Sequence, residues 1–130
     1  ATIDHIESST ALGERLTLIL AFNYSSRREI VLATQEIARR ALAGEIKVEE
    51  IDEEMFSNSL MTANIPDPDL VIRTSGECRL SNFLLWQASY AEFYFPEVLW
   101  PDFNEEEFDK AIEVFAQRDR RYGLVTDEIK

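Results

Sequence analysis

A polar turn between two apolar segments contains the residues that are best suited to chemistry, namely Arg73, Ser75, Gly76, Arg79 and Ser81. We predict a short buried strand before this turn and a helix after it, so the turn lies where a strand ends. Open α/β sheets bind ligands at that edge, and helix N termini present backbone N–H groups to anions. Each guanidinium group can donate two parallel hydrogen bonds to phosphate oxygens, so the two arginines predict a phosphate or diphosphate site.

The elements that must position this turn alternate between strand and helix. The apolar run Leu16–Phe22 has the continuous pattern of a strand that is covered on both faces. Ser26 and Glu29 have the spacing of a capping box, and the helix that follows ends near Gly44. The other expected elements are a helix from Asp52 through Leu60, a strand at Leu70–Arg73, a buried helix at Asn82–Ser89, a strand or extended segment at Phe93–Phe95, and a last helix capped by Asn104.

This order of elements predicts an α/β protein with a mostly parallel central sheet flanked by helices. We expect a single domain over residues 1–130, in which the polar residues 1–14 are irregular. Only three strands are visible in the sequence, which is few for a parallel sheet. We therefore expect either that a partner completes the sheet or that part of the chain is absent.

Composition and charge exclude several classes of function. The formal net charge of −12 argues against a general nucleic-acid binder, which would present a basic face. A single cysteine, Cys78, allows neither an internal disulfide nor a cysteine-based zinc site. His5 is the only histidine, so a Ser–His or Cys–His nucleophile is not expected. No apolar run reaches the roughly 18–20 residues that a membrane-spanning helix needs.

Each candidate residue also has a plain structural explanation that the sequence leaves open. Arg73 could pair with a nearby aspartate, and Arg79 could be a surface arginine at a helix start. Ser81 could serve only as a helix cap. Glu92, among aromatic residues, could be an exposed carboxylate of an edge strand. The arginines after the last helix could only complement the helix dipole.

Four separated segments of the chain have distinctive sequences. The longest begins at Arg73 and reads Arg-Thr-Ser-Gly-Glu-Cys-Arg-Leu-Ser-Asn-Phe-Leu-Leu-Trp-Gln-Ala-Ser-Tyr-Ala-Glu. The others are Asn-Tyr-Ser-Ser-Arg at 23–27, Leu-Trp-Pro-Asp-Phe at 99–103 and Arg-Arg-Tyr-Gly at 120–123. Together they closely resemble the cis-prenyltransferases, a family typified by undecaprenyl diphosphate synthase. In the segment 23–27, serines stand where that family commonly has glycines.

The resemblance implies an enzyme that condenses isopentenyl diphosphate with an allylic diphosphate to form a cis-polyprenyl diphosphate, using Mg²⁺. It also implies a mostly parallel sheet surrounded by helices, with a long apolar tunnel for the product. By resemblance, Arg73, Arg79 and Ser81 bind the diphosphate of isopentenyl diphosphate. Glu92 is similarly the position that helps to bind magnesium.

Two further implications concern assembly. Arg121 and Gly123 match the family's Arg-x-Gly tail, which reaches into the active site of the partner subunit. The family's N-terminal segments Asp-Gly-Asn-Gly-Arg-Trp and Phe-Ser-x-x-Asn-x-x-Arg do not occur in this sequence. We therefore expect the C-terminal half of such an enzyme, inactive alone, which forms a homodimer or associates with an N-terminal half. The alternative is a non-catalytic partner subunit of a heteromeric cis-prenyltransferase.

The resemblance gives only a general expectation of location. A cytoplasmic protein is expected, with a plastid or a membrane surface as alternatives. The apolar product favours proximity to a membrane, although no anchor is visible in the sequence.

Overall fold

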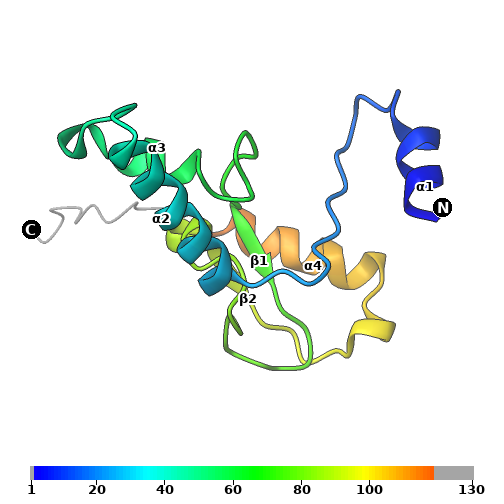
Figure 1. The fold of residues 1–130 in the computed structure, drawn as a ribbon. Helices are drawn as coiled ribbons and strands as arrows, with labels where there is room; N and C mark the ends of the chain where they lie inside the picture. Colours follow the sequence, from blue (N-terminus) through cyan, green and yellow to red (C-terminus); the bar gives the residue numbers. More distant parts are fainter. Residues whose placement is uncertain (1, 119–130) are drawn as a thin grey trace, which may run out of the picture.

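The computed structural model describes residues 2–118 of the chain. Its α-helices are α1 (Thr2–Thr10), α2 (Ser26–Leu42), α3 (Glu53–Ser57) and α4 (Glu105–Ala116), and its strands are β1 (Leu70–Ile72) and β2 (Glu92–Tyr94). Short 3₁₀ turns lie at Val48–Glu50, Gln87–Tyr90 and Trp100–Asp102. In Figure 1 the two strands lie near the centre, between α2 and α3 on one side and α4 on the other.

The sheet pairs β1 with β2 in parallel, with Leu70 opposite Glu92 and Ile72 opposite Tyr94. The Arg73 N–H extends this pairing by donating to the Tyr94 carbonyl at 3.0 Å. α4 packs against β2, and α2 packs against α3. A parallel pair with helices around it agrees with the expected α/β class.

The predicted strand at Leu16–Phe22 does not form, and this prediction is wrong. The run has no regular secondary structure and ends in a turn at Phe22, and its large side chains are exposed, with Leu16 at 83% and Phe22 at 74%. A strand needs the backbone of a neighbouring strand as its hydrogen-bond partner. Within residues 2–118 the sheet consists of β1 and β2 alone, and the run pairs with neither. The run has the apolar pattern of a buried strand, but no element among the described residues covers its side chains.

Residues 1–14 were expected to be irregular, but Thr2–Thr10 form helix α1. The hydroxyl groups of Ser8, Ser9 and Thr10 donate to carbonyls three or four residues earlier, which satisfies them within the helix. The helix is exposed along residues 3–10 and stands away from the other elements (Figure 1). Its side-chain hydrogen bonds are local and its residues 3–10 are exposed, so α1 has no buried apolar face.

Helix α2 has the expected span, but the predicted capping box is wrong. The N-cap is Ser25, and Glu29 does not reach back to the helix start. Glu29 is instead 1% exposed and points into the core. Its carboxyl group accepts hydrogen bonds from the Tyr24 hydroxyl, from Gln87 Nε2 at 3.0 Å and from the Met61 N–H at 3.1 Å. The helix ends before Gly44, whose φ of +75° is the left-handed conformation that favours glycine there.

The core is formed by residues of α2, of α4 and of the segments between the elements. Its buried apolar residues are Ala33, Ile37, Ile46, Leu60, Ala88 and Ala111. Trp86 extends this core. The centroid of its ring lies 4.6 Å from that of the Phe56 ring, and its Nε1 donates to Ser57 Oγ at 2.9 Å. The core is therefore small, and polar contacts between loops supplement it.

The predicted buried helix at Asn82–Ser89 is also wrong. Ser81, Asn82 and Leu84 have φ values of 50°, 64° and 47°, which a right-handed helix cannot contain. Helical geometry appears only in the 3₁₀ turn Gln87–Tyr90. The segment consists of turns before that 3₁₀ turn, so Ser81 does not begin an α-helix.

The caps of the remaining helices agree with the sequence. Asp52 accepts from the Met55 N–H at 2.8 Å and begins α3, which ends at Ser57 rather than at Leu60. Asn104 Oδ1 accepts from the Glu107 N–H at 3.1 Å and begins α4. These caps need only neighbours in sequence, which explains why they were predictable.

The contact between Tyr24 and Glu29 predicts a loss of stability in alkali. Burial raises the pKa of the Tyr24 phenol above its ordinary value of 10.0, and the hydrogen bond to Glu29 raises this pKa further. The folded state therefore retains a proton that the unfolded chain releases above about pH 10. The contribution of Tyr24 to the free energy of unfolding should be fully present and constant below about pH 10. It should be lost as the pH rises through the folded pKa.

Urea unfolding of the wild type and Tyr24→Phe, at several pH values on either side of about pH 10, measures this effect. The variant should lose less stability in alkali, because nothing titrates at its position 24. The exposed Lys110, whose pKa Glu107 and Glu106 raise to about 12, acts in the same direction but is common to both proteins. Equal alkaline slopes for the two proteins would contradict the prediction.

Candidate functional site

A hollow of about 260 Å³ lies at the carboxyl end of β1. Its lining consists of Val71, Ile72, Arg73, Arg79, Leu80, Ser81, Phe83 and Phe95. Apolar side chains from β1 and from the segment after β2 form part of this lining, and the polar turn contributes the charged part. The structure thus brings Arg73, Arg79 and Ser81 together around one cavity.

Arg73 organises the polar side of this hollow. Its backbone N–H is fixed by Tyr94, and its guanidinium Nη1 donates to the Arg79 carbonyl at 2.6 Å and to Ser81 Oγ at 2.8 Å. The side chain therefore crosses the turn from its first residue to its last. This arrangement holds a guanidinium group, a hydroxyl group and a second arginine within reach of one small ligand.

The turn itself is fixed against the segment that follows β2. The Ser75 N–H donates to the Val98 carbonyl at 2.8 Å, and the Gly76 N–H donates to the Pro96 carbonyl at 2.9 Å. Ser75 and Gly76 both have left-handed backbones, with φ values of 70° and 64°. These bonds keep the loop in a conformation that an isolated chain would rarely adopt.

Arg79 differs from Arg73 in its partner. Its guanidinium group pairs with the Glu77 carboxylate, and both side chains are largely exposed. Exposed pairs of this kind contribute little to stability, because water competes for both charges. An anion in the hollow could therefore replace Glu77 at a small energetic cost.

Glu92 lies at the other end of the same two strands. It begins β2, opposite Leu70, whereas Arg73 follows the last residue of β1. Its carboxylate accepts from Arg118 Nη1 at 2.8 Å and is about a quarter exposed. The described residues do not place Glu92 in the arginine-lined hollow.

Within residues 2–118 no three His, Cys, Asp or Glu side chains gather in a way that could hold a metal ion. Magnesium often takes only one or two protein carboxylates, with phosphate and water oxygens as its other ligands. Glu92 fits such a site as a single oxygen ligand, provided that its pairing with Arg118 is shared or broken. Arg121 and Gly123 lie outside the described residues.

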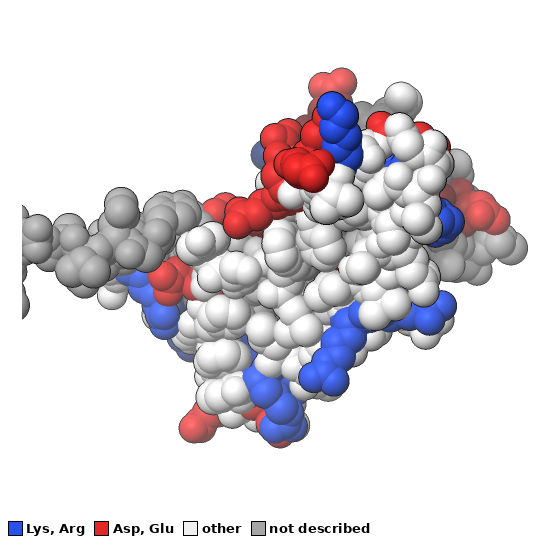
Figure 2. All heavy atoms as spheres, turned by 60° about the vertical axis from the view of Figure 1, so that its left-hand side comes forward, with Lys and Arg blue, Asp and Glu red and all other residues white. Residues whose placement is uncertain are grey.

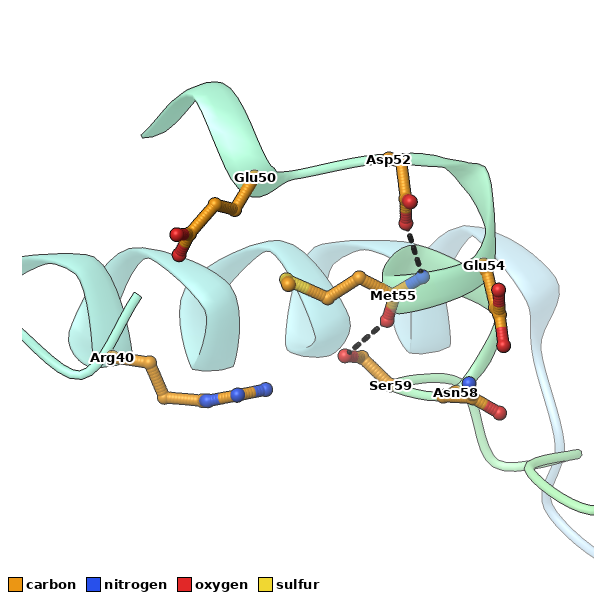
Figure 3. Close-up of a pocket in the computed structure, with 7 residues that line it drawn as sticks. All are labelled: Arg40, Glu50, Asp52, Glu54, Met55, Asn58 and Ser59. Carbon is orange, nitrogen blue, oxygen red and sulfur yellow. Dashed lines mark hydrogen bonds between the residues drawn. The ribbon is translucent and has the colours of Figure 1, made fainter. Parts of the chain in front are cut away.

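A second polar hollow, of about 390 Å³, lies between α2 and the segment around α3 (Figure 3). Asp52 and Ser59 point toward the backbone of Met55, with which both make hydrogen bonds. Glu50 accepts from the Lys47 N–H at 2.9 Å. Because these groups are used to fix the local backbone, we do not regard this hollow as the functional site.

Figure 2 shows one face of the molecule, on which acidic side chains gather toward the top and basic side chains lie along the lower part. A broad uncharged surface separates the two groups. The chain as a whole carries a formal charge of −12. An anionic ligand would therefore have to be attracted by local guanidinium groups, because the overall field repels it.

Residues 1–123 match the sequence model of the prenyltransferase family described as "Putative undecaprenyl diphosphate synthase". The chain belongs to this family. It is 51% identical over 127 residues to an isoprenyl transferase of Agrobacterium fabrum, a match that covers 98% of this chain and 51% of that protein. It is 56% identical over 108 residues to the ditrans,polycis-undecaprenyl-diphosphate synthase of Micrococcus luteus, which covers 83% of this chain and 43% of that protein.

Solved structures of prenyltransferases have the same fold. Lavandulyl diphosphate synthase from Lavandula x intermedia, in complex with dimethylallyl diphosphate, matches with a TM-score of 0.88 at 40% identity. That match covers 94% of this chain and 52% of the plant enzyme. A probable undecaprenyl diphosphate synthase from Campylobacter jejuni gives a TM-score of 0.74 at 38% identity, over 94% of this chain and 54% of that enzyme. The chain thus spans about half the length of these prenyltransferases.

Sequence reasoning missed two residues that shape this prenyltransferase chain. Glu29 was assigned to a cap, although its spacing to Ala33 and Ile37 places all three on one face of α2. That spacing was the available signal for its burial. Asn82 was assigned to a helix, and nothing in the sequence indicated its contacts with α2, which lies more than 50 residues earlier.

An apolar hollow of about 290 Å³ adjoins the same loops. Its lining includes Ile19 and Ala21 from the uncovered run, together with Tyr24, Met61, Phe83, Leu84 and Gln87. Among the described helices, none is long and apolar enough to cross a membrane.

The pairing of Glu92 with Arg118 predicts a small coupling energy. Because both side chains are partly exposed, a double-mutant cycle of Glu92→Gln and Arg118→Ala should give about 0.2–1 kcal/mol, measured by urea unfolding. The coupling should shrink in high salt, which screens such pairs. A coupling energy that is zero or independent of salt would contradict the pairing.

Proposed function

We propose that this chain takes part in prenyl-chain elongation, the condensation of isopentenyl diphosphate with an allylic diphosphate to give a cis-polyprenyl diphosphate. The observation behind the proposal is the hollow at the carboxyl end of β1, around which Arg73, Arg79 and Ser81 lie. Membership of the prenyltransferase family and the names of the relatives support the same reaction.

In this proposal the hollow binds the diphosphate group of isopentenyl diphosphate. Arg73 and Ser81 present donors that are already oriented by their mutual hydrogen bond. Arg79 exchanges Glu77 for a phosphate oxygen, which gives a charge-assisted bond. The side chains of Phe83 and Phe95 offer an apolar wall for the isoprene unit.

We further propose that Glu92 contributes one oxygen ligand to a magnesium ion, at the opposite end of the strands from the arginine-lined hollow. When bound, such an ion offsets the negative charge of the phosphate oxygens that it contacts. Glu92 must then share its carboxylate with Arg118 or release that arginine. The donor chemistry supports this role, since one carboxylate is sufficient when phosphates and water complete the shell.

The proposal also includes association. The relatives are about twice as long as this chain, and the exposed run Leu16–Phe22 offers a large apolar surface. We propose that a second copy of the chain or an N-terminal half covers that surface, and that Arg121 and Gly123 then reach a partner's site. The chain would work in the cytoplasm, with contact to a membrane surface through its apolar product.

The anion site can be tested by titrating the chain with isopentenyl diphosphate in a calorimeter. Arg73→Ala should weaken binding by roughly 1.5–3 kcal/mol, or about one to two decades in Kd, because one charge-assisted donor is lost. Arg39→Ala removes the same charge from an exposed position on α2 and is the matched control. It should change Kd less than about twofold. Equal losses in the two variants would exclude a specific site.

The activity of the chain alone tests the rest of the proposal. We expect no useful incorporation of radiolabelled isopentenyl diphosphate with magnesium and farnesyl diphosphate, because the family's N-terminal motifs are not in this sequence. Incorporation should appear when an N-terminal half from a relative is added. Robust turnover by the 130-residue chain by itself would contradict the expected division of the active site.

A further inference from the structure

Helix α2 is capped by a residue from a distant part of the chain. Its N-cap Ser25 makes no side-chain capping bond, although the first N–H groups of a helix need acceptors. Asn82 supplies two of them. Its carbonyl accepts from the Ser26 N–H at 2.9 Å, and its Oδ1 accepts from the Arg27 N–H at 2.8 Å.

The same asparagine is also held through its amide nitrogen. Asn82 Nδ2 donates to Ser25 Oγ at 2.7 Å. Close by, the Leu85 N–H donates to Ser26 Oγ at 2.9 Å, and Ser26 is fully buried. Four hydrogen bonds therefore connect the start of α2 with the segment from Asn82 to Leu85.

This segment needs such support because of its backbone. Ser81 and Asn82 are both left-handed, with φ values of 50° and 64°. Asparagine tolerates this region, whereas serine adopts it at a steric cost. Two consecutive left-handed residues persist only where the surrounding contacts determine them. In this structure the hydrogen bonds with the start of α2 hold the two residues in that conformation.

Ser81 transfers this constraint to the arginine of the hollow. Its Oγ accepts from Arg73 Nη1 at 2.8 Å, and the second bond of that nitrogen goes to the Arg79 carbonyl at 2.6 Å. Ser81 itself is exposed, so no packing fixes its hydroxyl group. The direction of the Arg73 guanidinium group therefore depends on where the backbone places Ser81.

We propose that Asn82 is a positioning residue for the arginine-lined hollow: by capping α2 it holds Ser81 where its hydroxyl group orients the Arg73 guanidinium group. The inference rests on the proposed function, because this orientation matters for activity only if the hollow binds a diphosphate. Asn82 does not line the hollow. It acts through its neighbour, at the junction between the polar turn and the helix start.

The test compares Asn82→Ala and Ser25→Ala with Asn104→Ala in the complete chain. Asn104 is the matched control, because it caps α4 with the same kind of bond and does not line the hollow. Three quantities are measured for each variant: the melting temperature, the affinity for inorganic diphosphate by calorimetry, and the ¹⁵N NMR signal of the Arg73 side chain, assigned by its loss in Arg73→Ala.

Asn82→Ala should weaken diphosphate binding by about 5- to 10-fold and shift the Arg73 signal, because both side-chain hydrogen bonds of Asn82 to the start of α2 are lost. Ser25→Ala removes a single bond and should weaken binding by about 2- to 5-fold. Asn104→Ala should lower the melting temperature to a similar degree while binding changes less than about twofold. This pattern separates positioning from a general loss of stability.

Two results would overturn the inference: an unmoved Arg73 signal in Asn82→Ala, or a loss of affinity in Asn104→Ala equal to that in Asn82→Ala. If Asn82→Ala does not fold, the diphosphate affinity and the Arg73 signal of Ser25→Ala test the inference in its place. If Arg73→Ala binds diphosphate as well as the wild type, the anion site of the proposed function fails. The Arg73 signal then still decides whether Asn82 orients that side chain.

Discussion

The carboxyl group of Glu29 connects three segments that are far apart in the sequence. Burying such a group without partners would cost several kcal/mol, so its hydrogen-bond donors must be in place together. The Tyr24 hydroxyl, the Met61 N–H and Gln87 Nε2 supply them. Through these bonds α2 holds both the loop that precedes β1 and the loop that precedes β2. The two strands can then meet in register although few apolar residues are buried around them.

The buried side-chain amide of Gln87 belongs to the same hydrogen-bond network. Its Nε2 donates to both Glu29 and Thr62, and its Oε1 is buried without a hydrogen-bond partner among the described residues. An unpaired buried oxygen is energetically unfavourable. The two hydrogen bonds that Nε2 donates therefore hold the Gln87 side chain in place. They also anchor the end of the loop that runs from Ser81 to Gln87.

The chemistry of the hollow depends on loops rather than on helix ends. The hollow lies at the carboxyl end of β1, which Arg73 directly follows, and this is the edge at which open α/β sheets bind ligands. No α-helix begins at Ser81, so the helix dipole that the sequence predicts there does not contribute. Attraction of an anion therefore falls to guanidinium and hydroxyl groups, whose directions are set by hydrogen bonds between loops. The same loops border the apolar hollow and the uncovered run Leu16–Phe22, so polar and apolar surfaces adjoin.

The sequence by itself determined the features that depend on near neighbours. The caps by Asp52 and Asn104, the end of α2 near Gly44 and the α/β class follow from short patterns whose physical causes are local. The grouping of Arg73, Arg79 and Ser81 was also predictable, because only eight residues separate the first from the last. Only the tertiary structure decided that Glu29 is buried, that Asn82 caps a helix more than 50 residues away, and that Leu16–Phe22 has no strand to pair with. Each of these outcomes depends on which distant group supplies a hydrogen-bond partner, and a sequence pattern does not contain that information.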